Sequence, residues 1–430
     1  MADITRPRVD HFEAMTSVVV SHFAKVPLFF WGRPGTGKSA MLGTVQQYIR
    51  DRAQEIVLEK DADGWYRLHV EAYQDFGLVD NRLSQQEGID IRGLFKIVQD
   101  DEGNEYTSTI RPIWLPYGGA GILAHDEYNM GGEDAKKAVM QLLTDGKVGT
   151  HILSLLYSQI GNGNLAIHKG LGKKLTPAEE NRWAHMWMDD GDTDLDPDYM
   201  DAEDHVAGRC AASFAALAVK DFTLEADDLP VDIEAGLKFQ ADVFDPRVSA
   251  YVAARPHLVN TFNAERNKRE DYGYASSRTW QYLSRVLQVC ELFGKKCFDQ
   301  VFKTFAYGLL GPGPAEDFCV TLDLLDKLID LDKVKHDGAN APLPLDDPKY
   351  KIGVTFVAIS ALATAGHFNK ATGKHIIDYV RRLPQVSPEI PPVFLQHLEA
   401  NARKVKSVEE AICDPDVGYM DLKRDYMVAA

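Results

Sequence analysis

Residues 32–39 read Gly32-Arg33-Pro34-Gly35-Thr36-Gly37-Lys38-Ser39 and fit the pattern G-x-x-x-x-G-K-[ST]. An apolar run, 26–31, precedes them, and apolar residues recur at helical spacing after Lys38. This order of strand, loop and helix predicts a phosphate-binding loop, because glycines let backbone N–H groups close around phosphate oxygens. Lys38 would reach the β- and γ-oxygens, and the Ser39 hydroxyl would bind magnesium. We therefore expect nucleotide contacts from Gly32, Arg33, Pro34, Gly35, Thr36, Gly37, Lys38, Ser39 and Ala40.

A second informative segment reads Gly121-Ile122-Leu123-Ala124-His125-Asp126-Glu127, an apolar strand that ends in two carboxylates. A site that hydrolyses a nucleotide needs a carboxylate for the magnesium ion and a neighbouring group that polarises the attacking water. We expect Asp126 to hold Mg²⁺ through its water shell and Glu127 to act as the base. His125 stands where such strands usually carry an apolar residue, and we interpret it as a core histidine with a backbone carbonyl partner and no catalytic role.

Strands and helices alternate through the first part of the chain, with helical spacing over 135–143 and a further predicted strand over 151–160. This alternation predicts a mostly parallel α/β sheet. Residues 189–204 are strongly acidic, and a solvated boundary is favoured over a calcium loop because Leu195 stands where an EF-hand needs its glycine. Beyond this boundary, helical spacing over 210–220 and 277–293 predicts a mainly helical remainder.

Composition narrows the function classes. The 430 residues form an ordinary globular chain of two or three domains, and a net charge of −17 argues against indiscriminate nucleic-acid binding. Five cysteines without a C-x-x-C pair argue against a disulfide framework or a zinc site. Residues 1–13 lack the apolar core of a signal peptide, and 352–369 is too interrupted for a membrane span, so we expect a cytoplasmic protein with no membrane association.

Several segments in order resemble the MoxR branch of AAA+ ATPases, close to the dynein-related group, over roughly Met15 to Leu292. They are Val26 to Leu42, Asp90-Ile91-Arg92-Gly93-Leu94, Trp114-Leu115-Pro116 and Gly121 to Asn129, the last ending in the D-E-x-N motif Asp126-Glu127-Tyr128-Asn129. The resemblance implies an α/β fold with a P-loop AAA+ domain over 1–204, a helical lid over 205–292 and additional C-terminal helices over 293–430. We recognise no chemistry in that last region.

The same resemblance implies roles for three further residues. Asn162 would be sensor 1, which orients the lytic water with Glu127, although Asn164 is the alternative. Arg182, in Asn181-Arg182-Trp183, would be an arginine finger that acts across a subunit boundary. Arg278, in Ser276-Ser277-Arg278, would be sensor 2 and contact the γ-phosphate of its own chain.

The expected function is Mg²⁺-dependent ATP hydrolysis by a homo-oligomeric ring, a hexamer by resemblance. Members of this branch remodel or mature protein complexes with a von Willebrand factor A domain partner, and we expect the same class of activity here. A nucleic-acid translocase or defence-system ATPase is the alternative, because the segment between Phe76 and Phe95 also holds Arg82 and Arg92 and would suit a ring pore. A P-loop module that only binds ATP is disfavoured because both Asp126 and Glu127 are present.

Overall fold

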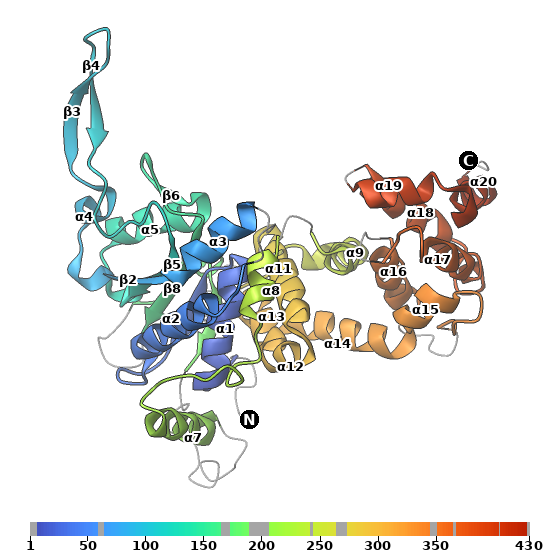
Figure 1. The fold of residues 1–430 in the computed structure, drawn as a ribbon, viewed down its shortest axis with the longest axis horizontal. Coiled ribbons are helices and arrows are strands. Elements are labelled where there is room, and N and C mark those ends of the chain that lie inside the picture. Colours follow the sequence, from blue (N-terminus) through green and yellow to red (C-terminus); the bar gives the residue numbers. More distant parts are fainter. Residues whose placement is uncertain are drawn as a thin grey trace. The chain divides into compact units, whose positions relative to one another are not determined.

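The computed structural model describes residues 7–58, 64–164, 173–188, 206–240, 244–263, 273–344, 351–363, 367–403 and 405–427 (Figure 1). The chain divides into two compact units, Met1–Asp242 with Asn260–Pro312, and Val243–Val259 with Gly313–Ala430. The three-part division expected from the sequence, with boundaries after 204 and 292, stays a prediction beside these two units. The acidic segment 189–204 lies outside the described residues.

The first unit contains a sheet of five parallel strands in the order β2-β5-β8-β1-β9. This confirms the predicted α/β fold with a parallel sheet. Because all five strands run the same way, their carboxyl ends meet at one edge of the sheet and their amino ends at the opposite edge. The strands are β1 Leu28–Trp31, β2 Gly77–Arg82, β5 Ala120–Asp126, β8 Leu156–Gly163 and β9 Ala184–Trp187.

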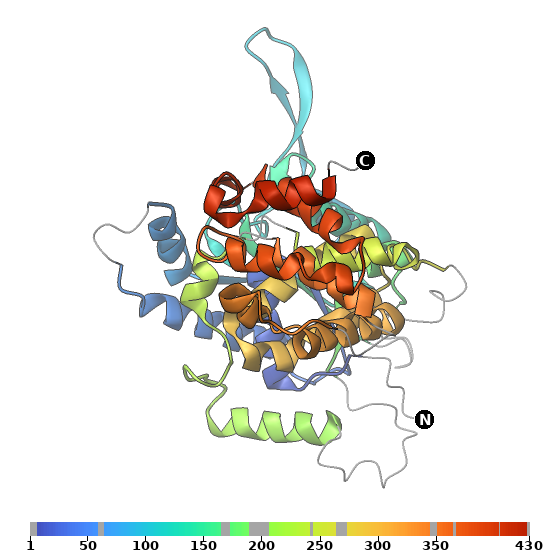
Figure 2. The same ribbon diagram turned by 90° about the vertical axis from the view of Figure 1, so that its right-hand side faces the viewer.

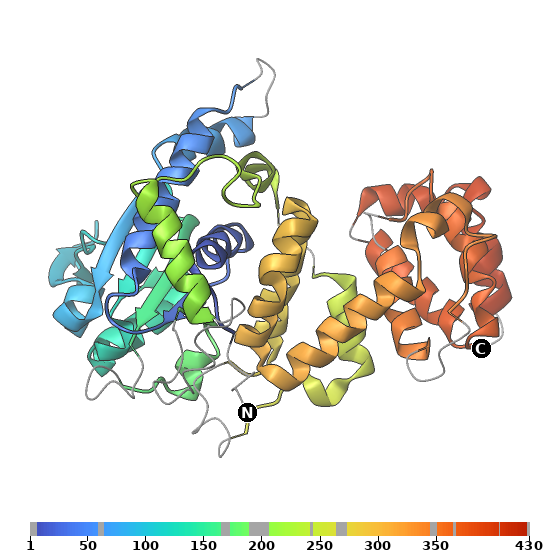
Figure 3. The same cartoon turned by 90° about the horizontal axis from the view of Figure 1, so that it is seen from below.

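Helices cover both faces of this sheet (Figure 3). Alternate side chains of a strand point to opposite faces, and Phe29, Trp31 and Leu123 form one core cluster with the buried residues of α5. Helices α1 and α2 contact β8 and β5. The helical segments of this unit are α1 His11–Ala24, α2 Lys38–Gln54, α3 Gly64–Gln74, η1 Leu83–Gln85, α4 Gly88–Arg92, η2 Tyr128–Met130, α5 Glu133–Asp145, α6 Pro177–Glu180, α7 Val206–Val219, α8 Ile233–Lys238, α11 Ser277–Phe293, α12 Lys295–Cys297, η5 Phe298–Phe302 and α13 Lys303–Leu310.

Two antiparallel hairpins stand outside the main sheet. One pairs β3 (Phe95–Gln99) with β4 (Glu105–Thr109) and projects away from the sheet (Figures 1 and 2). The other pairs β6 (Lys147–Val148) with β7 (His151–Ile152). The single strand predicted over 151–160 is therefore wrong in its first half. The chain turns at Ser154, whose N–H donates to Pro116 O at 2.9 Å and whose hydroxyl donates to Gly119 O at 2.7 Å.

The described part of the second unit is helical, as predicted for the C-terminal half. Gly311, at φ 76°, ends the preceding helix and Pro312 opens α14, so two helices meet here at a sharp break. No helix in the described ranges is long and apolar enough to cross a membrane. The helical segments are α9 Pro246–Ala254, η4 Pro256–Leu258, α14 Pro312–Leu328, α15 Leu331–Asp337, α16 Lys351–Leu362, α17 Gly373–Val380, η6 Leu383–Gln385, α18 Ile390–Ala402, α19 Lys406–Ile412, η7 Pro415–Val417 and α20 Tyr419–Met427.

Candidate functional site

A cavity of about 350 Å³ lies at the carboxyl edge of the parallel sheet. Adjacent strands bring its walls together, because β1 pairs with β8 and β8 pairs with β5. The loop after β1 supplies one wall, and the ends of β5 and β8 supply the others. The cavity is lined by Pro34, Gly35, Thr36, Gly37, Lys38, Ser39, Ala40, Asp126, Glu127, Asn162, Gly163 and Asn164. Of the expected nucleotide-binding loop, only Gly32 and Arg33 are not among these lining residues.

The loop conformation depends on its glycines. Gly35 and Gly37 have φ of 84° and 82°, in the left-handed region that favours glycine. Gly32 is needed for space, because a Cβ at this position would lie 2.5 Å from the backbone oxygen of Met188. Helix α2 begins at Lys38, so its first N–H groups and its positive dipole end face the cavity. The loop therefore offers a site for an anion such as a phosphate.

Lys38 is buried beside this loop. Its Nζ donates to Gly32 O at 2.9 Å and to Arg33 O at 2.7 Å. These hydrogen bonds hold the ammonium group at the cavity, where it adds a full positive charge to the partial charges of the backbone N–H groups.

The residues expected to hold Mg²⁺ are in direct contact. The Ser39 hydroxyl donates to Asp126 Oδ2 at 2.9 Å, while Asp126 Oδ1 accepts from the Glu127 N–H at 3.0 Å. Among the described residues there is no cluster of three or more His, Cys, Asp or Glu that could form a complete protein cage for a metal. Mg²⁺ commonly takes one or two protein oxygens and completes its octahedron with water and substrate phosphates. A hydroxyl and a carboxylate oxygen beside a phosphate-binding loop fit that requirement.

Glu127 directly follows β5 and has a left-handed backbone, with φ 53°. Its Oε2 accepts a hydrogen bond from the hydroxyl of Ser84, which lies in η1 directly after β2. The parallel register of β2 with β5, in which Arg82 stands opposite Asp126, brings Ser84 to this position. Sequence reasoning missed Ser84. The signal that could have identified Ser84 is its position just after β2. The sequence pattern did not predict β2, so this signal was not used.

Asn162 lies in β8 opposite Phe30 of β1, and its side chain is only 1% exposed. Within the part of the chain that the structure describes, neither its Nδ2 nor its Oδ1 has a hydrogen-bond partner, although both atoms are buried beside the cavity. A buried amide without partners costs free energy, so this side chain is suited to bind a group that enters the cavity. Asn164 differs, because its backbone is bound to the side chain of Asn129. The Asn164 N–H donates to Asn129 Oδ1 at 3.2 Å, and Asn129 Nδ2 donates to Asn164 O at 2.7 Å.

His125 is fully buried behind the two carboxylates. Its Nδ1 lies 3.2 Å from the Asn81 amide nitrogen, and its Nε2 lies 3.2 Å from Gln159 Oε1. These contacts assign the ring hydrogen to Nε2, which donates to Gln159. The interpretation as a core histidine holds, but its partners are side chains and not a backbone carbonyl. Burial lowers the pKa of His125 to about 4.

His185, in β9, is a second fully buried histidine. It accepts a hydrogen bond from Trp31 Nε1 at 3.0 Å and donates to Glu180 O at 2.9 Å, and burial lowers its pKa to about 4. The unfolded chain therefore binds a proton at each histidine near pH 6.5, whereas the folded chain does not until about pH 4. The free energy of unfolding should fall as pH decreases through this window, by up to about 3 kcal/mol for each histidine.

Urea unfolding of the wild type at pH 7.5, 6 and 5 measures this loss. Replacing His125 with glutamine should make the stability less dependent on pH, because the group that takes up a proton on unfolding is gone. Val57→Ala provides a control, because this exposed side chain does not titrate, and the variant should keep the wild-type dependence. Equal pH dependence in all three proteins would contradict the assignment of His125.

Arg182 and Arg278 do not line the cavity at the P-loop. Arg182 lies just before β9, at the amino edge of the sheet, where its Nε donates to Thr144 Oγ1 at 2.8 Å. Arg278 lies in the first turn of α11 and lines a second cavity of about 350 Å³, which includes Val26 and Pro27 before β1. Arg278 is therefore not among the residues that line the P-loop cavity, and its expected contact with the γ-phosphate of its own chain stays a prediction.

Asn181 connects the segments that carry these two arginines. Its Nδ2 donates to Tyr274 O at 2.9 Å, and its Oδ1 accepts from the Ser276 hydroxyl at 2.9 Å. Ser276 is the N-cap of α11, so these bonds fix the start of the Arg278 helix to the Arg182 segment. The two guanidinium groups are close enough that repulsion from Arg278, together with the larger effect of burial, lowers the pKa of Arg182.

The second cavity is positively charged. Lys25, Arg278 and Arg285 line it, and none of the described residues that line it is acidic. The Lys25 Nζ is buried and has no hydrogen-bond partner among the described residues, and burial lowers the pKa of this group to about 8. A buried cation of this kind favours an anion supplied by another molecule.

No family model matches the chain, and no curated protein matches it. Among solved structures, the chain is similar to a crystal structure of "a putative ATPase" from Cytophaga hutchinsonii, with 12% identity and a TM-score of 0.41, covering 72% of this chain and 86% of the other.

Proposed function

We propose that this protein is a Mg²⁺-dependent ATPase of the AAA+ type that works as a homo-oligomeric ring and remodels protein complexes. The observation that carries the proposal is the cavity in which the P-loop meets Asp126, Glu127 and Asn162 at the carboxyl edge of a parallel sheet. Parallel α/β sheets bind their ligands at this edge. The residue types present are those that phosphoryl transfer to water requires.

In the proposed reaction, the P-loop N–H groups and Lys38 bind the β- and γ-phosphates of ATP. Ser39 and Asp126 would hold Mg²⁺, which when bound neutralises charge on the phosphate oxygens. Glu127 accepts a proton from the attacking water, and Ser84 keeps its carboxylate in place through the hydrogen bond to Oε2. The unpaired amide of Asn162 orients that water or the γ-phosphate.

The oligomeric part of the proposal follows from the two arginines. Arg182 and Arg278 lie together at the amino edge of the sheet, whereas the phosphate cavity lies at the carboxyl edge. A head-to-tail ring would bring this basic edge of one subunit to the nucleotide of the next. We therefore propose that both arginines, and not Arg182 alone, act on a neighbour's nucleotide, with Lys25 and Arg285 adding to the positive field. A hexamer is the ring size that the resemblance implies.

A polypeptide is the proposed substrate class, and the projecting hairpin supports it. Phe95, Ile97 and Tyr106 are exposed on it, and its strands and turn carry one lysine against four carboxylates. Such a surface repels a phosphate backbone and suits apolar protein segments. The expected pore segment is corrected in one respect, because Phe76 is fully buried and cannot contact a substrate. A von Willebrand factor A domain protein remains the proposed partner.

Phosphate release from Mg-ATP as a function of protein concentration tests the proposed function. Activity per chain should rise with concentration, because each site needs arginines from a neighbour, and single-stranded DNA should leave the activity unchanged. Activity that is flat with concentration would contradict the ring, and stimulation by single-stranded DNA would favour a nucleic-acid translocase.

A further inference from the structure

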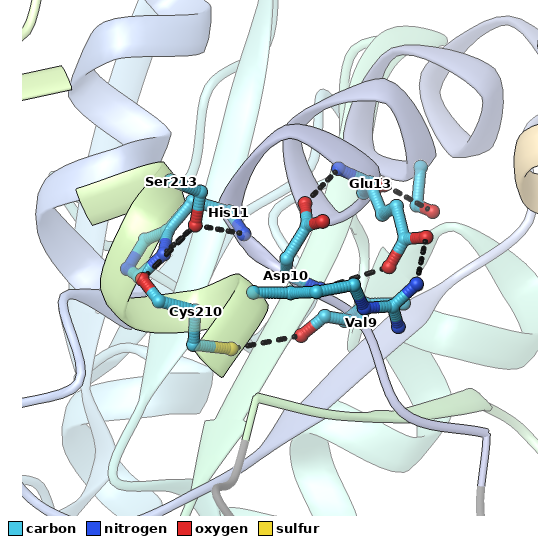
Figure 4. A network of polar contacts seen from close by, with 8 residues as sticks. Val9, Asp10, His11, Glu13, Cys210 and Ser213 are labelled. Atoms are coloured by element: carbon cyan, nitrogen blue, oxygen red, sulfur yellow. Dashed lines mark hydrogen bonds and ion pairs between the residues drawn. The ribbon is translucent and has the colours of Figure 1, made fainter. Parts of the chain in front are cut away.

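His11, the first residue of α1, lies between the P-loop and helix α7. Its Nε2 is 3.1 Å from Thr36 O. Its Nδ1 is 2.8 Å from the Ser213 hydroxyl of α7 (Figure 4). His11 and Ser213 are each 6% exposed, so water competes little for these contacts. One buried imidazole thus bridges a loop of the phosphate cavity and a helix about 200 residues away in sequence.

The hydrogen-bond directions follow from the partners. A carbonyl oxygen only accepts, so Nε2 of His11 carries the hydrogen that points at Thr36 O. The Ser213 hydroxyl has one hydrogen, which Nδ1 of His11 at 2.8 Å and Cys210 O at 3.0 Å can each accept, and its oxygen accepts from the His11 backbone N–H at 3.3 Å. Two contacts to the same hydroxyl fix the position of the ring, so Ser213 determines where Nε2 points.

The bond to Thr36 O determines the orientation of a peptide group in the P-loop. The Thr36 carbonyl and the Gly37 N–H belong to one planar peptide and point in opposite directions. While His11 holds the carbonyl, the Gly37 N–H points away from His11 and is available to a phosphate oxygen. Contact is close, because a Cβ at Gly37 would lie 3.4 Å from His11 Nε2. Since Gly37 lines the phosphate cavity, the ring acts on the anion site itself.

Helix α7 is bound to the start of α1 by further contacts. Arg209 pairs with Glu13 at 3.2 Å, and the Cys210 thiol lies 3.5 Å from Val9 O (Figure 4). Asp10 and Glu13 form a capping box that fixes the first turn of α1. Helix α7 therefore packs against a rigid part of the chain. Its Ser213 contacts His11, and His11 in turn contacts the P-loop.

We propose that His11 is a positioning residue of the phosphate-binding loop and that docking of α7 through Ser213 sets the affinity for nucleotide. The inference rests on the proposed function in taking a nucleotide as the ligand of the cavity. By linkage, nucleotide binding and α7 docking stabilise each other to the same extent.

The test measures the Kd of Mg-ADP by titration and the KM and kcat for Mg-ATP, in full-length variants. Ser213→Ala removes the hydroxyl and should raise Kd and KM about 2- to 10-fold with kcat unchanged, the worth of one buried hydrogen bond. Ser213→Thr keeps the hydroxyl and should restore both values. Val219→Ala is the matched control on the same helix, because Val219 is 87% exposed, and its Kd should equal that of the wild type.

Hydrogen exchange of the α7 amides provides a readout that a purely structural role would not change. Mg-ADP should slow exchange in α7 of the wild type and of Val219→Ala, but not in His11→Phe, which keeps a ring and loses both polar contacts of the ring. Equal Kd values in Ser213→Ala and Val219→Ala would overturn the positioning role while leaving the proposed function intact. A wild type that binds neither Mg-ATP nor Mg-ADP would overturn both.

Discussion

Replacing Glu127 with glutamine is expected to lower the turnover of Mg-ATP by about 100- to 10,000-fold, the usual contribution of a general base. Glutamine keeps the size of the side chain and a carbonyl oxygen that accepts the hydrogen bond from Ser84, but it cannot take a proton from water. Nucleotide affinity should be retained, because Lys38 and the loop N–H groups that bind phosphate are unchanged. Single-turnover phosphate release and titration with Mg-ADP measure the two quantities separately.

The control is Glu133→Gln, which removes an exposed carboxylate from the first turn of α5 outside the cavity. Its turnover should match that of the wild type. Turnover of Glu127→Gln within tenfold of the wild type would show that another group activates the water. Loss of Mg-ADP binding in this variant would show instead that Glu127 supports the loop and not the chemistry.

Mixing two inactive variants tests the arrangement of the arginines. Arg278→Ala and Arg182→Ala are each expected to lose about a thousandfold in turnover, as trans-acting arginines do in phosphoryl transfer. Lys38→Ala should be inactive because its own loop no longer holds the phosphates. Combined with either arginine variant, Lys38→Ala should restore about a quarter of the wild-type activity in mixed head-to-tail rings, because some interfaces then join an intact loop to intact arginines.

The result for Arg278 separates the two possible arrangements. If Arg278 contacts the nucleotide of its own chain, the mixture of Arg278→Ala with Lys38→Ala recovers nothing, since no subunit then has both groups. If activity recovers when Lys38→Ala is mixed with Arg182→Ala but not with Arg278→Ala, Arg182 acts on the neighbour's nucleotide. Arg278 then acts as a sensor for the nucleotide of its own chain. Arg424→Ala, in which an exposed arginine of the second unit is removed, should be fully active alone.

Local patterns predicted the elements that carry the phosphate chemistry. The apolar run before Gly32 predicts a strand over 26–31, and β1 occupies Leu28–Trp31. The predicted helix over 277–293 matches α11, because a serine N-cap and a strong apolar period mark both its start and its course. In contrast, β2, β9 and the projecting hairpin went unpredicted. Each is short, and strands depend on partners that are distant in sequence.

The functional residues divide in the same way. The phosphate-binding loop, the start of the helix after it, and the paired carboxylates Asp126 and Glu127 follow from the sequence alone. Each of them depends on residues within about ten positions and on the chemistry of phosphate binding. The contacts of Ser84 with Glu127 and of His11 with Thr36 and Ser213, and the place of Arg278 at the second cavity, arise only in the folded chain. They depend on the order of parallel strands and on helices packed from distant parts of the chain. Free energy of burial, summed over the core, selects that arrangement, and no local pattern encodes it.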